Sequence, residues 1–309
     1  MKTIIVPTDF SECSVAAYGY AAFLAEKTGA EIYLMHILDI PASNASTFKS
    51  MDKENLGNVP FMMQMMKLIK LRMKKAKAEK VFKNLKIKDI IEIGTIPEKT
   101  FAAVKNYKAD MIVMGTHGVN GIQEKFIGSN AEKIVRNADI PVLTVKHALK
   151  NLRLETILFA TDFSKEAELV LPEISKIAEL FKARLILTKV VTLNDFEPTS
   201  ATNEQITSFR EKNEIYNYST QVYYAYSREE GIRQVAENIG ADVIALGTHG
   251  RHGLAHFFRG SIAEDVVSHA SLPVMTLNFH KKLINEKKKI IRNKTARYES
   301  DMLYQIPSV

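Results

Sequence analysis

Cysteine is scarce in this chain of 309 residues, where Cys13 stands alone. One cysteine can form neither an intrachain disulfide nor a cysteine-based metal cluster, which agrees with a reducing compartment. Nothing near it resembles a thiol-protease signature. Long apolar runs are also missing at the N-terminus, because Pro7 and Asp9 interrupt the first one before a signal-peptide core or a spanning helix could form. We therefore expect a cytoplasmic protein without a membrane partner.

No extreme of composition is present either. Hydrophobic residues make up 46% of the chain and charged residues 25%, which excludes collagen-like, disordered and membrane classes. The length predicts two domains. The net charge is +7, but residues 281–309 hold eight Lys/Arg against three Asp/Glu. Because most of the excess charge lies in this tail, we do not expect a nucleic-acid partner.

What the chain does contain is an internal repeat, which decides its organisation. The segment Ile4–Ser11 returns as Ile157–Ser164, and Met114–Gly118 returns as Leu246–Gly250. The first copy is longer between the two motifs, where it carries a polar loop and a Met- and Lys-rich helix. We predict three parts, which are domain one at 1–148, domain two at 152–280 and a basic tail at 281–309.

Short apolar runs alternate with helical patterns in each copy, as in βαβ units with a parallel sheet. Helices are expected to begin after Ser11 and Ser164 and to end at Gly29 and near Lys182. Strands apolar at every position indicate helices on both faces. The fold class is thus α/β, with two tandem three-layer α/β/α domains of five parallel strands each. The predicted strands are 2–8, 31–38, 87–94, 110–115, 141–146, 155–161, 184–191, 219–226, 242–247 and 273–278.

A helix is predicted from about Pro60 to Leu85, with an apolar stripe that includes Met65, Ile69 and Met73 and with lysines off that stripe. Such a basic amphipathic helix could bind a membrane surface or a partner groove. The favoured interpretation is that the stripe packs on its own sheet while the lysines are solvated.

The strongest local motif follows the fourth strand of each copy. Gly115-x2-Gly118 is followed after nine residues by Gly128-Ser129, and Gly247-x2-Gly250 is followed after nine residues by Gly260-Ser261. Glycines at a strand end allow positive φ and a close approach of ligand. A helix that starts at Gly-Ser offers unpaired N–H groups and the positive end of its dipole. Together these features predict a phosphate cradle.

The cradle matches neither a Walker A loop nor a dinucleotide fingerprint. Asp9 and Asp162 end the first strand of each copy, at the edge where ligands of open α/β sheets bind. A carboxylate there could accept from ribose hydroxyls or hold Mg²⁺ through water. Each aspartate could instead only stabilise the start of the helix that follows it. His249, His252 and His256 suggest zinc, but no acidic or cysteine partner stands at a suitable spacing, so zinc is disfavoured.

The glycine pattern, with Pro-Thr-Asp after the first strand, resembles the ATP-binding members of the universal stress protein family over nearly all of residues 1–280. The resemblance implies an adenine-nucleotide α-hydrolase-like fold that assembles through its last strand. It also implies adenine near the end of strand two and phosphates on the glycine loop. The site residues that it implies are, in copy one, Pro7, Thr8, Asp9, Ile37, Met114, Gly115, Gly118, Gly128, Ser129 and Asn130, and in copy two, Thr161, Asp162, Val190, Leu246, Gly247, Gly250, Gly260, Ser261 and Ile262.

Copy two departs from this pattern at Ala160, where copy one has Pro7, and at Tyr226-Ser227, where copy one has Gly94 and then Pro97. Copy one is therefore the stronger candidate for ATP. Neither loop shows a dedicated base or a lysine for the γ-phosphate, so we expect a nucleotide-dependent stress or signalling factor rather than an enzyme. Slow ATP hydrolysis and a nucleotide-free interaction scaffold are the alternatives.

The final strands would leave free edges, so we expect the two copies to pair through them as an intramolecular pseudo-dimer. A homo-oligomer is also compatible with the sequence. The tail at 281–309 has no counterpart after copy one, and its first part fits a short amphipathic helix.

Overall fold

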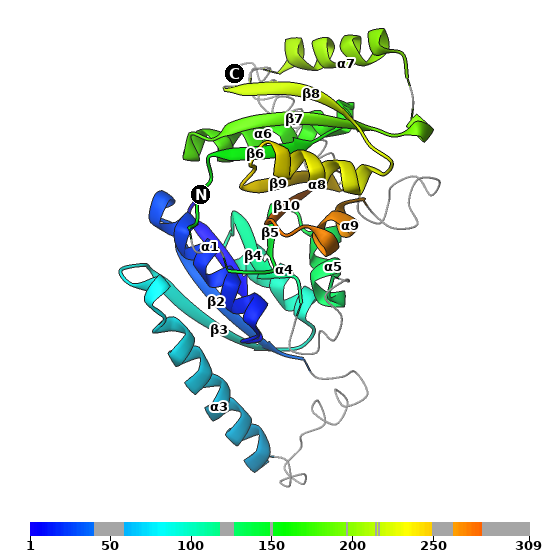
Figure 1. The fold of residues 1–309 in the computed structure, drawn as a ribbon. Helices are drawn as coiled ribbons and strands as arrows, with labels where there is room; N and C mark the ends of the chain where they lie inside the picture. The colour runs from blue at the N-terminus through cyan, green and yellow to red at the C-terminus, as the bar shows by residue number, and fades with distance from the viewer. Residues whose placement is uncertain are drawn as a thin grey trace, which may run out of the picture.

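The computed structural model shows two α/β halves that share one continuous sheet (Figure 1). It describes residues 1–39, 59–117, 127–148, 151–195, 197–213, 215, 217–248 and 262–279. The order of the ten strands is β3-β2-β1-β4-β5-β10-β9-β6-β7-β8. The strands are β1 Thr3–Pro7, β2 Glu31–Leu38, β3 Ile87–Ile93, β4 Met111–Gly115, β5 Val142–Val145, β6 Thr156–Ala160, β7 Arg184–Val191, β8 Tyr218–Tyr224, β9 Val243–Thr248 and β10 Val274–Asn278.

Within each half all neighbouring strands are parallel, as predicted. Ile4 and Val6 pack on one face of the sheet and Ile5 on the other, because successive side chains alternate along a strand. Helices cover both faces, which explains the continuous apolar runs. The helices are α1 Glu12–Thr28, α3 Val59–Lys77, η2 Lys80–Phe82, α4 Ile96–Asn106, α5 Ser129–Asn137, α6 Lys165–Phe181, η3 Leu193–Asp195, α7 Thr199–Lys212, α8 Arg228–Asn238 and α9 Ile262–His269.

The predicted ends of the first helix in each copy are present. The Oγ atoms of Ser11 and Ser164 cap α1 and α6 by accepting a backbone N–H of the first turn. Gly29 and Lys182 end the two helices in the left-handed conformation, with φ of 69° and 55°.

The helix predicted as one piece from Pro60 to Leu85 is divided. Helix α3 ends at Lys77, the backbone turns extended at Glu79, and η2 follows. Burial is the reason, because Phe82 is 4% exposed and its ring lies 5.4 Å from that of Tyr18 on α1. A continuous helix would not turn this side chain towards the sheet.

The two halves meet where β5 pairs antiparallel with β10. Leu143 pairs with Met275, which is its own counterpart in the second copy. The helices that follow the glycine loops also touch across this junction, where Arg136 of α5 contacts Glu264 of α9 at 2.5 Å. Strand pairing between the copies therefore covers both free edges of the central strands.

Candidate functional site

Three segments of copy one meet at the carboxyl ends of β1 and β4. Asp9 follows β1, and its Oδ1 accepts from the backbone N–H of Ser11 at 3.0 Å. The Ser11 hydroxyl donates to the carbonyl oxygen of His117, which follows β4, at 3.4 Å. The predicted residues Asp9 and Gly115 are thus brought to one edge of the sheet, although the contact to Ser11 also gives Asp9 a role at the start of α1.

Close packing between α1 and β4 requires a glycine at position 115. A Cβ at this position would lie 2.7 Å from the backbone carbonyl carbon of Cys13 and 2.8 Å from its Cβ. Only glycine lets α1 come this close to the end of β4. The contact between α1 and β4 is therefore sufficient to explain this glycine, whether or not a ligand also approaches it.

Gly128 is the N-cap of α5, and its backbone is extended, with φ −62° and ψ 141°. This conformation is open to any residue, so backbone freedom is not the reason for glycine here. Its N–H donates to the carbonyl oxygen of Thr116 at 2.8 Å, and an added Cβ would lie 3.1 Å from the same oxygen. The following residues, Ser129 and Asn130, form the first turn of α5, where backbone N–H groups lack intrahelical acceptors.

The start of α5 carries no side-chain cap within the described part of the chain, as is also the case for α4 and α7, whereas α1, α6 and α8 are each capped by a serine. Ser129 is exposed and Asn130 is half-buried. The first N–H groups of a helix lack intrahelical acceptors and carry its positive partial charge. This end of α5 is consequently suited to an anion.

Other predicted residues of copy one lie in the core. Pro7 is buried, and the buried Thr8 hydroxyl donates to Ser14 Oγ at 3.1 Å and also contacts the Tyr18 hydroxyl. Ile37 and Met114 are 7% and 6% exposed. A ligand could therefore reach these residues mainly through their backbone. Gly118 lies outside the described residues.

Sequence reasoning missed a ring cluster beside Asp9. His36, at the end of β2, stacks on Phe10 with ring centroids 4.8 Å apart, and its Nδ1 lies 2.8 Å from the Thr8 carbonyl oxygen. Burial lowers the pKa of His36. Phe10 has φ of 65° and Arg72 of α3 lies 5.9 Å from the centre of its ring. The sequence feature that could have indicated this cluster is the phenylalanine that follows the Thr-Asp pair in both copies.

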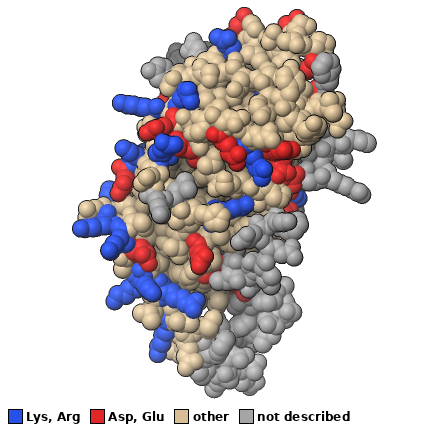
Figure 2. Space-filling model, viewed as in Figure 1, with Lys and Arg blue, Asp and Glu red and all other residues tan. Residues whose placement is uncertain are grey.

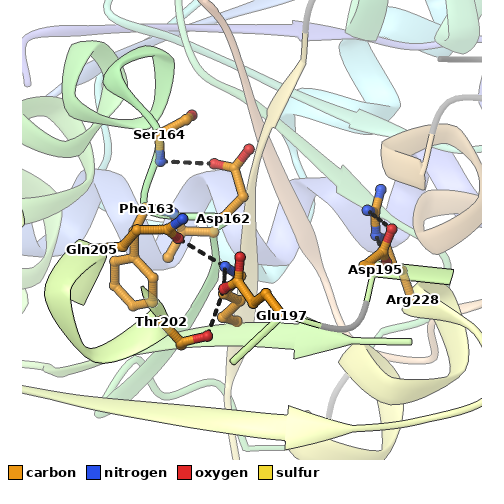
Figure 3. A network of polar contacts seen from close by, with 10 residues as sticks. Asp162, Phe163, Ser164, Asp195, Glu197, Thr202, Gln205 and Arg228 are labelled. Carbon is orange, nitrogen blue, oxygen red and sulfur yellow. Dashed lines mark hydrogen bonds and ion pairs between the residues drawn. The ribbon is translucent and has the colours of Figure 1, made fainter. Parts of the chain in front are cut away.

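Copy two has a cavity of about 630 Å³ beside Asp162, between the start of α6, the end of β7 and helix α7 (Figure 3). Asp162 is exposed, and its Oδ1 accepts from the N–H of Ser164 at 3.0 Å. The cavity is lined by Asp162, Phe163, Ser164, Lys165, Glu168, Lys189, Asp195, Glu197, Glu204, Gln205, Ser208, Phe209, Lys212 and Arg228.

Paired charges hold one wall of this cavity. The Lys189 ammonium contacts Glu197 and donates to Gln205 Oε1 at 2.8 Å. Bonds from Lys189 and Thr202 lower the pKa of Glu197. Lys189 stands at the position in β7 that His36 has in β2, so the two copies present different chemistry beside their aspartates.

A second ion pair, between Arg228 and Asp195, lies beyond the end of β7. Arg228 contacts both carboxylate oxygens of Asp195, at 2.7 and 3.0 Å, and the Thr192 hydroxyl donates to the same carboxylate at 2.7 Å. Burial alone would raise the pKa of Asp195, but the bonds from Thr192 and Arg228 outweigh it and the pKa is lowered. This carboxylate is therefore held ionised.

The glycine at the end of β9 is covered by an aromatic ring. A Cβ on Gly247 would lie 1.7 Å from Cζ of Phe279, which follows β10 and is 9% exposed. Leu246 is buried, and the Val190 side chain packs towards Gly231 of α8. Thr161 and Ile262 are half-buried. Gly250, Gly260 and Ser261 lie outside the described residues.

The metal predictions rest on one carboxylate in each copy. No group of three or more His, Cys, Asp or Glu that could hold a metal ion exists among the described residues. Asp9 and Asp162 each direct one oxygen to a helix start. Asp9 or Asp162 could therefore hold a Mg²⁺ ion only through water, and phosphate oxygens of a ligand would have to supply the direct contacts. The three histidines considered for zinc lie outside the described residues.

The fold is that of an α/β protein of the adenine-nucleotide α-hydrolase-like class, present in two tandem copies. The model of the universal stress protein family matches residues 1–146 and again 153–278. The chain belongs to the universal stress protein family.

Individual relatives agree with this assignment. Universal stress protein Slr1230 of a Synechocystis strain is 25% identical over 289 residues, which is 89% of this chain and 99% of that protein. Universal stress protein MJ0531 of Methanocaldococcus jannaschii is 31% identical over 150 residues, which is 48% of this chain and 84% of that protein.

A universal stress protein from Archaeoglobus fulgidus has the same fold, with a TM-score of 0.65, 20% identity and coverage of 89% of this chain and 96% of that one. Another universal stress protein has been crystallised with cAMP, at 16% identity and a TM-score of 0.35, so that ligand is a property of that protein.

Proposed function

We propose that this universal stress protein binds ATP in copy one and acts as a nucleotide-dependent factor in stress response or signalling. The phosphates would lie at the start of α5, on the amides of Ser129 and Asn130. The ribose would lie near Asp9, and adenine near the backbone of Ile37. Gly115, Gly118 and Gly128 would line the path between them.

The observation that carries the proposal is the open N-terminus of α5, which hydrogen bonds connect to the segment of Asp9 through the end of β4. Gly128 donates to Thr116, and the next residue, His117, accepts from Ser11. Ser11 links the two sides, since it bonds with Asp9 on one side and with His117 on the other. A nucleotide has an anionic end and a hydroxyl-bearing sugar, which match an uncapped helix start and a nearby carboxylate. Mg²⁺ would supply charge neutralisation of the phosphates, and Asp9 would hold one of its waters.

Binding rather than turnover is the proposed activity. Phosphoryl transfer requires cations placed on the transferred phosphate and a group that orients the nucleophile. Among the described residues of copy one, Asp9 is the group on the sheet edge that could hold a metal, and it already accepts from Ser11. We expect any ATP hydrolysis to be slow, and the protein to work in the cytoplasm.

Copy two is proposed as a weaker or altered site. Phe279 covers Gly247, and paired charges hold the wall beside Asp162. Paired carboxylates and cations suit a polar ligand better than the flat apolar face of adenine. The proposed stoichiometry is therefore one ATP for each chain, with the two copies arranged as an intramolecular pseudo-dimer.

The test is titration calorimetry of ATP with Mg²⁺ on the parent and on Gly128→Val, with Gly260→Val, the equivalent change in copy two, as the matched control. A valine at position 128 places Cβ against the Thr116 carbonyl oxygen and branches over the start of α5. We expect Gly128→Val to lose at least about tenfold in affinity, since one displaced phosphate contact is worth roughly 1.5–3 kcal/mol. Gly260→Val should bind as the parent does.

Two results would contradict the proposal. One is a parent protein that binds no ATP and releases no nucleotide when denatured after purification, which would favour the interaction scaffold. The other is a loss confined to Gly260→Val, which would place the site in copy two.

A further inference from the structure

Helix α3 has an exposed apolar set that is separate from its core stripe. Ile69 and Met73 are 4% and 1% exposed and pack against the sheet, as the sequence predicted. Met63, Leu68 and Leu71 are 59%, 44% and 65% exposed. Figure 1 shows α3 at the β3 edge of the sheet, where its first turns project from the body.

Positive charge is concentrated on the second half of α3 and on the residues that follow it up to the start of β3. Residues 67–88 contain ten Lys/Arg and one Asp/Glu, a net charge of +9, which exceeds the +7 of the whole chain. Acidic residues elsewhere in the folded body offset this charge. The net charge of the body is therefore small, although the charge of residues 67–88 is large. Figure 2 shows Lys and Arg gathered over the α3 side of the molecule.

Lysines and apolar residues interleave on the outward face of α3. Lys67 and Leu71 are four residues apart and Lys74 follows after three more, so these three share one side of the helix. Lys67, Lys70, Lys74 and Lys75 are all exposed. The ion pairs described for this segment are Lys77 with Asp89 and Lys88 with Glu31, and both lie towards β3.

We propose that the outward face of α3 binds reversibly to a membrane surface that contains anionic lipids. Leu68, Leu71 and Met63 would enter the boundary between headgroups and acyl chains. The lysines would extend their aliphatic stems along the same face and place their ammonium groups at lipid phosphates. In the described residues no helix is long and apolar enough to span a membrane, so the contact is with the surface alone.

Other occupants match this face less well. A nucleic acid would use the lysines but would leave the exposed Leu and Met side chains without a partner. Stacking on single-stranded bases needs aromatic side chains, and Phe82, the aromatic residue of segment 67–88, is 4% exposed. A second copy of the chain would bring two lysine-rich faces together, and like charges repel. Lysines on an edge strand can also protect a sheet from pairing with another strand. This explanation applies to Lys88 on β3, but it does not explain the lysines of helix α3.

The absence of tryptophan from the chain makes a direct test possible. Leu71→Trp places one fluorescent reporter on the proposed face, and Tyr226→Trp, at a side chain that is 91% exposed in copy two, is the control. With vesicles of phosphatidylserine and phosphatidylcholine, we expect the emission of the Leu71→Trp variant to shift to shorter wavelength. The emission of the Tyr226→Trp variant should remain unchanged. Pure phosphatidylcholine vesicles should shift neither.

Sedimentation with the same vesicles tests the charges. The triple variant Lys67→Gln, Lys70→Gln and Lys74→Gln is compared with Lys27→Gln, Lys105→Gln and Lys176→Gln, which removes equal charge from exposed positions elsewhere. Each lysine near an anionic surface contributes about fivefold, so the first variant should bind on the order of 100-fold more weakly. The control should bind nearly as the parent does. Leu68→Ser with Leu71→Ser should weaken binding while circular dichroism shows the fold retained.

Several results would overturn the proposal. Absence of binding to phosphatidylserine vesicles is one, and equal loss in both lysine triples is another. If Leu68→Ser with Leu71→Ser binds as the parent does, the apolar face has no part in the contact. Retention of a duplex DNA or of an acidic protein by the parent, with no retention on vesicles, would assign the lysines to that other partner.

Discussion

The ring of Phe279 occupies the space into which a side chain on Gly247 would point, with Cζ 1.7 Å from the ideal Cβ position. In copy one the equivalent glycine, Gly115, faces the backbone of Cys13 instead. The residue that corresponds to Phe279 in copy one is His147, which is exposed. One side chain after the last strand therefore makes the ends of the two fourth strands different.

The first prediction concerns this difference. Phe279→His gives copy two the residue of copy one and should uncover Gly247, so the stoichiometry of ATP should rise from one to nearly two for each chain. Titration calorimetry with Mg²⁺ measures it, and Gly128→Val in the same background isolates copy two. An unchanged stoichiometry would mean that the charged wall at Lys189, and not the ring, determines what copy two accepts.

The second prediction concerns Asp9. Asp9→Asn removes the charge that would hold a hydrated Mg²⁺ but keeps a side-chain oxygen for the N–H of Ser11. ATP affinity measured with Mg²⁺ should fall by about tenfold, because a hydrogen bond to a charged group is worth roughly 1.5–3 kcal/mol. Chelation of Mg²⁺ should weaken the parent more than it weakens Asp9→Asn, because the variant has already lost the contact of Asp9 with the hydrated ion. An equal response of both proteins to the chelator would separate Asp9 from the metal.

Much of the fold follows from the sequence because its signals are local and occur twice. The caps at Ser11 and Ser164 and the apolar strands are encoded within a few residues, and the structure confirms them. The break between α3 and η2 depends on the burial of Phe82 against Tyr18, which is a contact between distant segments. Periodicity within one helix carries no information about such a contact.

The candidate site was predictable only in part. The sequence indicates which residues end β1 and β4, and the structure places Asp9 and Gly115 at one edge. It does not indicate that Gly128 donates to Thr116, or that Phe279, which follows the neighbouring strand β10, covers Gly247. Those outcomes depend on how the elements pack.

The third prediction concerns Asp242, which sequence reasoning passed over although Asp110 stands at the same place in copy one. Asp242 is 8% exposed, and its Oδ2 accepts from the backbone N–H groups of Glu155 and Thr156 at 2.8 and 3.0 Å. Asp242→Ala should leave both amides unpaired at the start of β6 and cost about 1–3 kcal/mol of stability. Urea unfolding measures this cost. Asp110→Ala removes the two equivalent amide contacts at an exposed carboxylate and should cost less, because Asp242 is buried and also accepts from Arg153 Nε at 2.7 Å. Equal losses would show that neither burial nor the Arg153 contact decides the effect.

The last prediction is a pH dependence that arises at His36. Burial between Phe10 and the Thr8 carbonyl oxygen lowers the pKa of this imidazole, although the Thr8 carbonyl and the charge of Asp9 oppose the shift. The neutral ring is therefore favoured in the folded protein, and Nδ1–H donates to Thr8.

The direction of the effect on stability follows from the two pKa values. The unfolded chain takes up a proton at His36 near the ordinary value of about 6.5, and the folded chain takes it up only at lower pH. The stabilisation is thus fully present above about pH 6.5 and decreases as the pH falls through and below that value. His36→Phe keeps a ring to stack on Phe10 but cannot titrate, so its free energy of unfolding should fall less than that of the parent between about pH 7.5 and about pH 5.5. His147→Phe, at an exposed histidine, should follow the parent. Urea unfolding at a series of pH values provides the measurement, and parallel curves for the parent and His36→Phe would show that protonation at this ring does not destabilise the fold.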